Sequence, residues 1–298
     1  MEPKKIMIWL SSIRPRTLPA AAAPVIIGLA LAFYDAKINI LIASLTLISA
    51  LLIQIGTNLS NDYFDFIKGA DTEKRVGPVR STQTGLVKKN EMLFAFILTF
   101  VLAMISGIFL VIRGGYPVVI IGVFAIIFGI LYTAGPAPLG YIGLGDIFVF
   151  IFFGLISVAG TFYLQTLRIN SIVLIASTAP GLLSTAILTA NNIRDIKTDR
   201  QSGKRTLIAR LGYNFGIFEY MFCVITAHLI PFILVLITKS HYFSLVSVLS
   251  ITMAVKPLKL IISRPDQDPR SLIPVLGITS QMLLIFAVLF SIGWNIKV

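Results

Sequence analysis

Long apolar runs separated by short polar connections fill almost the whole chain. A helix needs roughly 17 to 25 mainly apolar residues to cross the hydrocarbon core of a bilayer. The runs of this length lie at residues 18–34, 39–60, 92–112, 117–133, 145–164, 171–190, 213–237, 242–262 and 272–295. The pattern predicts an all-α, polytopic membrane protein with nine transmembrane helices around a central cavity. An amphipathic segment at 4–13 is expected to lie at the membrane interface.

The composition supports a membrane protein and excludes a soluble one. Of the 298 residues, 56% are hydrophobic and 13% are charged, which is about half the charged fraction of a soluble domain. The single cysteine, Cys223, lies in an apolar run and is expected to be a small buried hydrophobe. The two histidines, His228 and His241, share no spacing with acidic or sulfur ligands, so no zinc or haem site is expected.

The net charge of +12 follows from the placement of the basic residues along the predicted spans. If the nine runs cross the membrane in turn, one side of it receives only five of the 25 Lys and Arg residues: Lys37, Arg113, Arg168, Lys239 and Lys297. The others lie near the N-terminus and around the connections after the second, fourth, sixth and eighth runs. The positive-inside rule makes the side with these remaining 20 basic residues cytoplasmic and places the N-terminus there. Topology thus explains most of the basic character, and no nucleic-acid partner is expected.

Two clusters of Asn and Asp are notable because acidic groups near a bilayer core are costly. Both lie at cytoplasmic ends of predicted helices. The first places four side chains on one helical face: Asn58, Asn61, Asp62 and Asp65. Asp71 follows Gly69, a residue type that often ends helices, and so lies on a loop. The second cluster places three side chains on one face: Asn191, Asp195 and Asp199.

A basic, glycine-containing loop follows each cluster. The two loops are residues 74–82 and 200–206. Placing Asn61 over Asn191 also places Asp65 over Asp195, which is a faint internal repeat. It predicts two related halves, about 1–140 and 141–298, inside one membrane domain that spans 1–298. Chance similarity is the alternative.

The oxygen-rich clusters predict a particular kind of ligand. Carboxylate and amide oxygens without His or Cys suit a hard cation such as Mg²⁺, which prefers a few carboxylates plus substrate phosphate oxygens. Lys and Arg in the adjoining loops can hold the remaining phosphate charge. A diphosphate with a lipid-like organic group is therefore the predicted ligand. Each cluster alone could be a set of solvated ion pairs, but two similar clusters on one membrane face favour a site.

Several motifs resemble the UbiA superfamily of intramembrane prenyltransferases, and together they cover nearly the whole chain. They are RPRTLP at 14–19, NLSNDYFDFIKGAD at 58–71, GPVR at 77–80, LYTAGP at 131–136, GLGD at 143–146, NNIRD at 191–195 and GKRTL at 203–207. The first acidic motif and its neighbours look most like the branch that prenylates 1,4-dihydroxy-2-naphthoate in menaquinone synthesis. Two features depart from the superfamily's common pattern. The spacing from Asp65 to Asp71 is longer, and Asp146 replaces an expected Glu.

The resemblance implies a Mg²⁺-dependent transfer of a polyprenyl group from polyprenyl diphosphate to the naphthoate. The ring would lose CO₂ and become a demethylmenaquinol. The residues that would hold Mg²⁺ are Asn61, Asp65, Asp71, Asp195 and Asp199, with Asp62 as a secondary member. Whether Asp62 or Asp71 completes this set stays open. The residues expected to act in catalysis are Asp65, Asp195, Asp199 and Tyr132.

Further residues receive binding roles from the same resemblance. The diphosphate would contact Arg80, Lys204, Arg205, Asn191 and Asn192. The ring face of Tyr132 would stabilise a carbocation, or Tyr132 is an interfacial anchor. Arg14 and Arg16 would bind the acceptor carboxylate, or they are positive-inside anchors.

Other functions fit parts of the same pattern. The acceptor could instead be 4-hydroxybenzoate, homogentisate or a haem, and the donor could be a phytyl diphosphate. A secondary transporter would also have repeats and polar groups within the membrane, but acids concentrated at one face favour diphosphate chemistry. The expected partners are the two substrates and the bilayer, without an obligate protein partner. The expected location is the cell inner or plasma membrane, with the site open to the cytoplasm.

Overall fold

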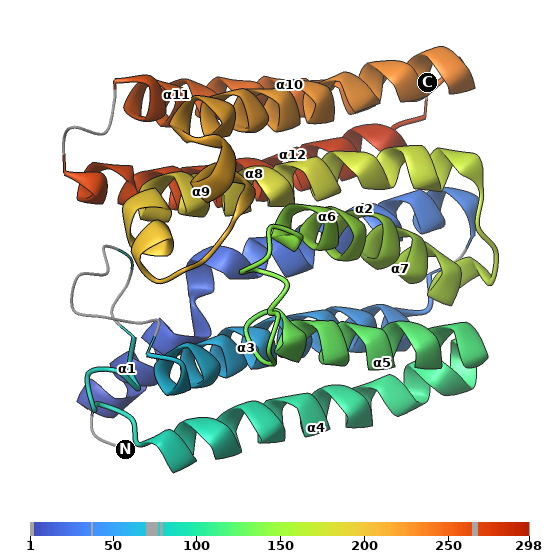
Figure 1. The fold of residues 1–298 in the computed structure, drawn as a ribbon. Helices are drawn as coiled ribbons and strands as arrows, with labels where there is room; N and C mark the ends of the chain where they lie inside the picture. Colours follow the sequence, from blue (N-terminus) through green and yellow to red (C-terminus); the bar gives the residue numbers. More distant parts are fainter. Residues whose placement is uncertain (1–2, 37, 70–76, 78–79, 264–267, 298) are drawn as a thin grey trace.

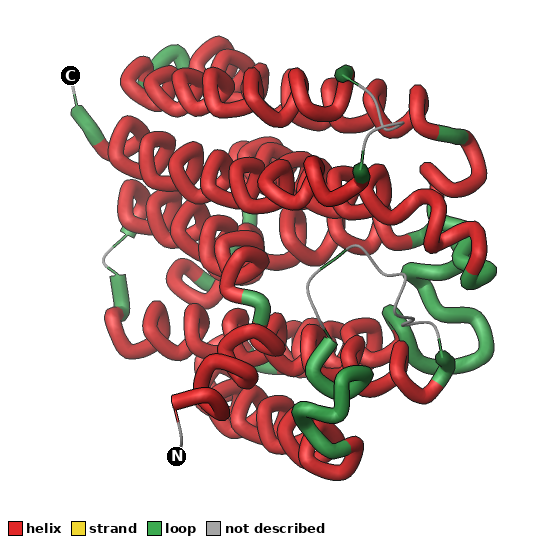
Figure 2. Tube along the Cα trace, turned by 90° about the vertical axis from the view of Figure 1, so that its left-hand side faces the viewer, coloured by secondary structure: helices red, strands yellow, loops and turns green. Residues whose placement is uncertain are grey.

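The computed structural model describes residues 3–36, 38–69, 77, 80–263 and 268–297. These residues form helices joined by loops and include no strand, as Figure 2 shows. The predicted all-α fold is therefore confirmed. Within the described ranges, eight helices are long and apolar enough to cross a membrane, and a shorter apolar helix, α5 (Tyr116–Leu131), supplies the ninth.

The predicted spans appear in order and lie roughly parallel in one bundle (Figure 1). They are α2 (Leu18–Asp35), α3 (Ile40–Ile67), α4 (Lys89–Gly114), α5, α6 (Gly145–Phe150) with η2 (Ile151–Ile156) and α7 (Ser157–Thr166), α8 (Ser171–Gln201), α10 (Tyr213–Thr238), η3 (Tyr242–Ala254) with α11 (Val255–Ile262), and α12 (Ile273–Asn295). The shorter elements are α1 (Pro3–Ile13), η1 (Pro15–Thr17), α9 (Leu207–Leu211) and η4 (Pro269–Leu272). In Figure 1 the labels α1, α9 and α11 gather at one end of the bundle.

The helices that carry the two polar clusters continue beyond their apolar runs. Helix α3 extends to Ile67 and helix α8 to Gln201, past the apolar runs that end near residues 60 and 190, as the helical spacing of the two clusters predicted. Intrahelical hydrogen bonds satisfy the backbone of these last turns regardless of whether their side chains are apolar. The polar side chains of both clusters are therefore held on rigid helix rather than on loops.

The start of the first span is a bent unit of three helices. The predicted amphipathic segment forms α1, which exposes Ile6, Met7 and Leu10. Arg14 follows in a left-handed backbone conformation, with φ 57°. This conformation is uncommon for a residue with a side chain. The Asn58 Nδ2 donates to the Ile13 carbonyl oxygen at 2.9 Å, so α3 holds the end of α1 in place.

Helix α8 passes through the middle of the main core. Buried apolar residues from α2, α7, α8, α10 and α12 pack together there, among them Leu183 and Phe286. Gly181 on α8 meets Gly154 of η2 so closely that a Cβ on Gly154 would lie 2.7 Å from the Gly181 Cα. Small residues at such a crossing allow membrane helices to pack by direct backbone contact. A second core, around Met92 and Phe96, joins α3 to α4.

Two spans contain helix types that the apolar pattern did not predict. The fifth span changes to a π-helix over Ile151–Ile156. The eighth begins as a 3₁₀ helix of 13 residues. Three residues per turn place Ser244, Ser247 and Ser250 on one line, and all three are buried. Hydropathy detects the length of a span but not its helical pitch, because an average over a window does not record which residues share a face.

Candidate active site

A cavity of about 520 Å³ opens where the ends of α3 and α8 meet η1, the loop at 132–144 and the loop at 202–206. The charged and amide residues that line it are Arg14, Arg16, Asn61, Asp62, Asp65, Arg80, Asn191, Asn192, Arg194, Asp195, Asp199 and Lys204. Both predicted polar clusters thus face one cavity, although they lie far apart in sequence. The described lining carries five basic and four acidic side chains, which suits an anionic ligand.

The first cluster is buried on the last turns of α3. Asp65 is 1% exposed, Asp62 is 2% exposed and Asn61 is 7% exposed. The Thr133 hydroxyl donates to the Asn61 Oδ1 at 2.9 Å, which fixes the orientation of that amide. Asn58 was predicted on the same helical face, but it does not line the cavity. Its amide donates to the Ile13 carbonyl and to the Thr17 Oγ1 instead.

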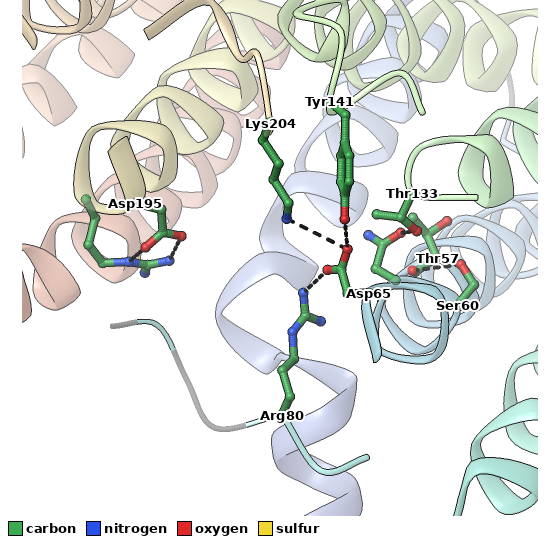
Figure 3. Close-up of polar contacts among 10 residues, drawn as sticks. Thr57, Ser60, Asp65, Arg80, Thr133, Tyr141, Asp195 and Lys204 are labelled. Atoms are coloured by element: carbon green, nitrogen blue, oxygen red, sulfur yellow. Dashed lines mark hydrogen bonds and ion pairs between the residues drawn. The ribbon is translucent and has the colours of Figure 1, made fainter. Parts of the chain in front are cut away.

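Asp65 lies at the centre of the polar contacts (Figure 3). The Arg80 Nη2 lies 2.7 Å from its Oδ2, the Tyr141 hydroxyl donates to its Oδ1 at 2.6 Å, and the Lys204 Nζ lies 3.7 Å from the same oxygen. Arg80 and Lys204 come from the basic loops that follow the two clusters. Asp65 therefore binds both predicted cationic loops through one carboxylate.

The second cluster occupies the cavity side of α8. Asp195 accepts two hydrogen bonds from Arg194, at 2.7 Å from Nε and 2.6 Å from Nη2. Asp199 is buried, and its carbonyl oxygen accepts a hydrogen bond from the Lys204 amide at 2.9 Å. This backbone contact holds Lys204 beside the cavity.

Two oxygen atoms among the described residues are buried without a hydrogen-bond partner and belong to residues that line the cavity. They are the Asp62 Oδ1 and the Asn191 Oδ1, one from each cluster. Unpaired buried acceptors are costly in a folded protein. In an oxygen-lined cavity their chemistry suits a hard cation. No group of three His, Cys, Asp or Glu side chains close enough to hold a metal occurs in the described part of the chain, so carboxylates alone do not form a closed cage.

The remaining predicted site residues differ in how they relate to the cavity. Arg14 and Arg16 line it from η1 and its N-cap, and the Arg14 charge interacts with the Asp62 carboxylate. Arg205 is exposed and is not among the lining residues, although its amide takes part in a loop contact. Asp71 lies outside the described residues.

Tyr132 caps α5 and also lines the cavity. Its ring packs on Gly140, where a Cβ would lie 2.9 Å from the Tyr132 Cε1. A tyrosine hydroxyl has an ordinary pKa of about 10. The side chain is therefore neutral at physiological pH and offers an aromatic ring and a hydroxyl.

Two further carboxylates are buried away from the cavity lining. Asp146 on α6 is 6% exposed, and its Oδ1 has no hydrogen-bond partner among the described residues. Glu219 on α10 is also buried and accepts a hydrogen bond from the Thr189 hydroxyl at 3.2 Å. Asp146 belongs to a motif that the sequence singled out, but neither residue was assigned a role.

Sequence reasoning missed three residues that contact the clusters: Thr133, Tyr141 and Arg194. Thr133 lies in the motif at 131–136, and Tyr141 lies just before the motif at 143–146. These motifs indicated the family but assigned no function to either residue. A tyrosine next to a predicted membrane end is by default an interfacial anchor. Only the folded loop shows that the Tyr141 hydroxyl reaches Asp65.

The model of the UbiA prenyltransferase family matches residues 21–284. The chain belongs to the UbiA prenyltransferase family. The 1,4-dihydroxy-2-naphthoate octaprenyltransferase of Escherichia coli (strain K12) is 40% identical to it over 292 residues, which cover 96% of this chain and 94% of that protein. The 1,4-dihydroxy-2-naphthoate octaprenyltransferase of Bacillus subtilis (strain 168) is 31% identical over 280 residues, which cover 94% of this chain and 89% of that protein. The resemblance inferred from the motifs, including its naphthoate branch, is confirmed.

The structure of a UbiA homolog from Archaeoglobus fulgidus bound to DMAPP and Mg²⁺ has the same fold. The TM-score is 0.69 at 15% sequence identity, with 95% of this chain and 99% of that chain covered. At this identity the similarity establishes the arrangement of the helices.

Proposed function

We propose that the chain transfers a polyprenyl group from polyprenyl diphosphate to 1,4-dihydroxy-2-naphthoate, with loss of CO₂, to give a demethylmenaquinol. The observation that carries this proposal is the cavity between α3 and α8. In this member of the UbiA prenyltransferase family, the cavity brings together both Asn/Asp clusters and the basic residues Arg80 and Lys204 from the loops that follow them. The names of the relatives that match over nearly the full length support the naphthoate as acceptor.

The residues of the cavity fit a Mg²⁺ ion. The side chains that would hold it are Asn61, Asp65, Asp195 and Asp199, completed by Asp62 or Asp71. Asp62 has an unpartnered oxygen at the cavity. When bound, Mg²⁺ would act as a Lewis acid that neutralises the diphosphate leaving group. The unpartnered Asn191 oxygen, on the opposite cluster, is a further hard donor.

The cationic side chains would receive the diphosphate. Arg80 and Lys204 already point their charges at Asp65 from two loops, so a short side-chain movement would transfer them to phosphate oxygens. Arg194 lines the cavity too. These charges lie beside the cavity before substrate binds, and once on the phosphate oxygens they would stabilise the leaving group. Asn192 also lines the cavity, whereas Arg205 would have to reach in from the exposed loop.

The transfer itself makes one bond and breaks two. The allylic C–O bond breaks, and its electron pair leaves with the diphosphate. The ring carbon that bears the carboxylate forms the new C–C bond, and the carboxylate leaves as CO₂ while its bonding pair returns to the ring. The neutral Tyr132 ring, beside the cavity, would stabilise the allylic cation through its face.

The membrane orientation is part of the proposal. The cavity lies at the end of the bundle that carries the basic loops, and the positive-inside rule makes this the cytoplasmic side. We place the protein in the cell inner or plasma membrane as one domain of two related halves. Each half contributes one long helix, α3 or α8, whose last turns carry an Asn/Asp cluster that faces the same cavity.

A comparison of three acceptors tests the proposed function. Membranes that carry the protein are incubated with polyprenyl diphosphate, Mg²⁺ and one of three aromatic acids, and the lipid extract is analysed by mass spectrometry. A decarboxylated quinol should form from 1,4-dihydroxy-2-naphthoate, with little product from 4-hydroxybenzoate or homogentisate. Comparable product from either of these acids would reassign the acceptor. Uptake of an anion down a gradient, without any prenylated product, would indicate a transporter.

The proposed acceptor site at Arg14 predicts a change in the KM for one substrate. Asparagine tolerates the left-handed backbone of Arg14, so Arg14→Asn removes the charge with little backbone strain. Loss of a charge-assisted hydrogen bond should raise the KM for the naphthoate about tenfold or more, with a small change in the KM for polyprenyl diphosphate. Steady-state kinetics with each substrate varied in turn measures both values. An unchanged KM for the naphthoate would leave Arg14 as a membrane anchor.

A further inference from the structure

The loop at 132–144 joins the two halves of the cavity through backbone contacts. The Tyr141 carbonyl oxygen accepts a hydrogen bond from the Arg205 amide at 2.7 Å. Two residues later Gly143 adopts φ +86°, and a Cβ there would lie 3.0 Å from the Arg205 carbonyl oxygen. The loop at 132–144 and the loop at 202–206 are therefore packed backbone to backbone, and Tyr141 stands at their junction.

The Tyr141 side chain contacts Asp65 of the first acidic cluster, Lys68 just after it, and Lys204 of the loop that follows the second cluster. Its hydroxyl donates to the Asp65 Oδ1 at 2.6 Å. The Lys204 Nζ lies 4.5 Å from the centre of its ring and the Lys68 Nζ lies 5.2 Å from it. Figure 3 shows the ring descending from its loop to Asp65, with Lys204 beside it. Lys68 is held in turn by the Gly135 carbonyl oxygen at 2.7 Å, on the same loop as Tyr141.

Tyr141 differs from the other partners of Asp65 because it is neutral. Arg80 and Lys204 are cations, and a diphosphate in the cavity would attract both of them away from Asp65. A phenol has no net charge to transfer, so its hydrogen bond to Asp65 persists when the cations move. A carboxylate has about four lone-pair positions, so one bond at Oδ1 leaves the others open to a metal ion. A persistent donor of this kind fixes the direction of the remaining lone pairs.

We propose that Tyr141 is a positioning residue with two functions. Its hydroxyl orients the Asp65 carboxylate toward the metal ion, and its ring holds the Lys204 ammonium beside the diphosphate. The inference rests on the proposed function, because it takes the cavity as a site for Mg²⁺ and a diphosphate. The alternative is an interfacial anchor, the common role of a tyrosine near a membrane end. An anchor directs its hydroxyl to headgroups, whereas Tyr141 lines the cavity and donates to a buried carboxylate.

The two functions can be separated by two substitutions. Tyr141→Phe removes the hydroxyl and keeps the ring, while Tyr141→Leu removes both. Loss of a partner that orients a metal ligand typically weakens metal affinity about 10- to 100-fold. Both variants should therefore bind Mn²⁺, a spectroscopic probe for Mg²⁺, at least about tenfold more weakly in the presence of inorganic diphosphate. Only Tyr141→Leu should also raise the KM for polyprenyl diphosphate severalfold, because only this variant loses the ring beneath Lys204.

The measurement is Mn²⁺ titration of purified full-length protein by electron paramagnetic resonance, followed by steady-state kinetics. Tyr163→Phe is the matched control, because the Tyr163 hydroxyl also donates one hydrogen bond, to the Gly114 carbonyl oxygen at 3.0 Å, away from the cavity lining. Wild-type Mn²⁺ affinity in Tyr141→Phe would overturn the proposal. An equal loss in Tyr163→Phe would also overturn it, since the effect would then be general destabilisation.

The outcomes separate this inference from the proposed function. If the Tyr141 variants bind Mn²⁺ more weakly than the wild type, but the wild type prenylates no naphthoate, the positioning role is supported and the proposed acceptor is refuted. A wild-type protein that binds no Mn²⁺ with diphosphate would refute the metal site and the Tyr141 role together.

Discussion

Replacing Asp65 with asparagine is expected to lower prenyl transfer by about 100-fold or more, the usual effect of removing one preorganised electrostatic group from an active site. The substitution keeps the shape of the side chain but removes the charge that faces the cavity. Asp65 is 1% exposed and is the common partner of Arg80, Tyr141 and Lys204. The variant would lose a metal ligand and the reference point for both cationic loops. Product formation in membranes with saturating substrates measures the loss.

Two companion variants distinguish a lost ligand from a damaged fold. Asp65→Asn breaks the buried ion pair between Arg80 and Asp65, and this charge imbalance by itself destabilises a protein. The double variant Asp65→Asn with Arg80→Gln removes that imbalance, so it should recover stability in detergent without recovering activity. Asp35→Asn is the matched control, because Asp35 is exposed at the end of α2 farthest from the cavity. Near-normal turnover in both Asp65→Asn and Asp199→Asn would refute the metal assignment.

Removal of divalent metal is expected to abolish product formation completely. The hard oxygen donors of the two clusters suit Mg²⁺, and without it the negative charge of the leaving diphosphate is only partly neutralised. EDTA should therefore stop the reaction, and excess Mg²⁺ should restore it. Ca²⁺ should restore much less, because it prefers six to eight oxygen ligands at longer distances, about 2.3 to 2.6 Å. The measurement is the initial rate of lipid product formation after each addition.

The metal experiment has its own control and its own contradicting result. EDTA already saturated with Mg²⁺ should leave the rate unchanged, which excludes an effect of the chelator on the membrane. Full activity in EDTA would refute a divalent metal in the reaction. Equal rates with Ca²⁺ and Mg²⁺ would show that the site does not select a small octahedral cation.

The spans and the acidic clusters could be predicted from sequence because each is a local property. A run of apolar residues sets its own helix length, and residues three or four apart share a helical face regardless of the rest of the fold. Helical spacing correctly grouped the residues of each cluster that line the cavity, which are Asn61 and Asp65 on α3 and Asn191, Asp195 and Asp199 on α8. The family motifs then gave these groups a substrate.

Other features could not be predicted because they depend on contacts between distant segments. Asn58 has the same helical spacing as Asn61 and Asp65, yet it binds the end of α1, which the spacing cannot show. Arg205 follows Lys204 directly, but only Lys204 lines the cavity. The π- and 3₁₀-helical segments are also invisible to hydropathy, because a window average does not record helical pitch.

The two Asn/Asp clusters show most clearly which features follow from local sequence and which depend on the tertiary structure. By itself the sequence determined that costly polar groups stand at the same end of two membrane helices, because charge and helical periodicity are carried by neighbouring residues. Only the tertiary structure decided that Asp65 is shared by Arg80, Tyr141 and Lys204, whereas Asp195 is paired with its neighbour Arg194. The physical reason is that the partners of Asp65 lie on three different loops, and their meeting point depends on how the whole bundle packs.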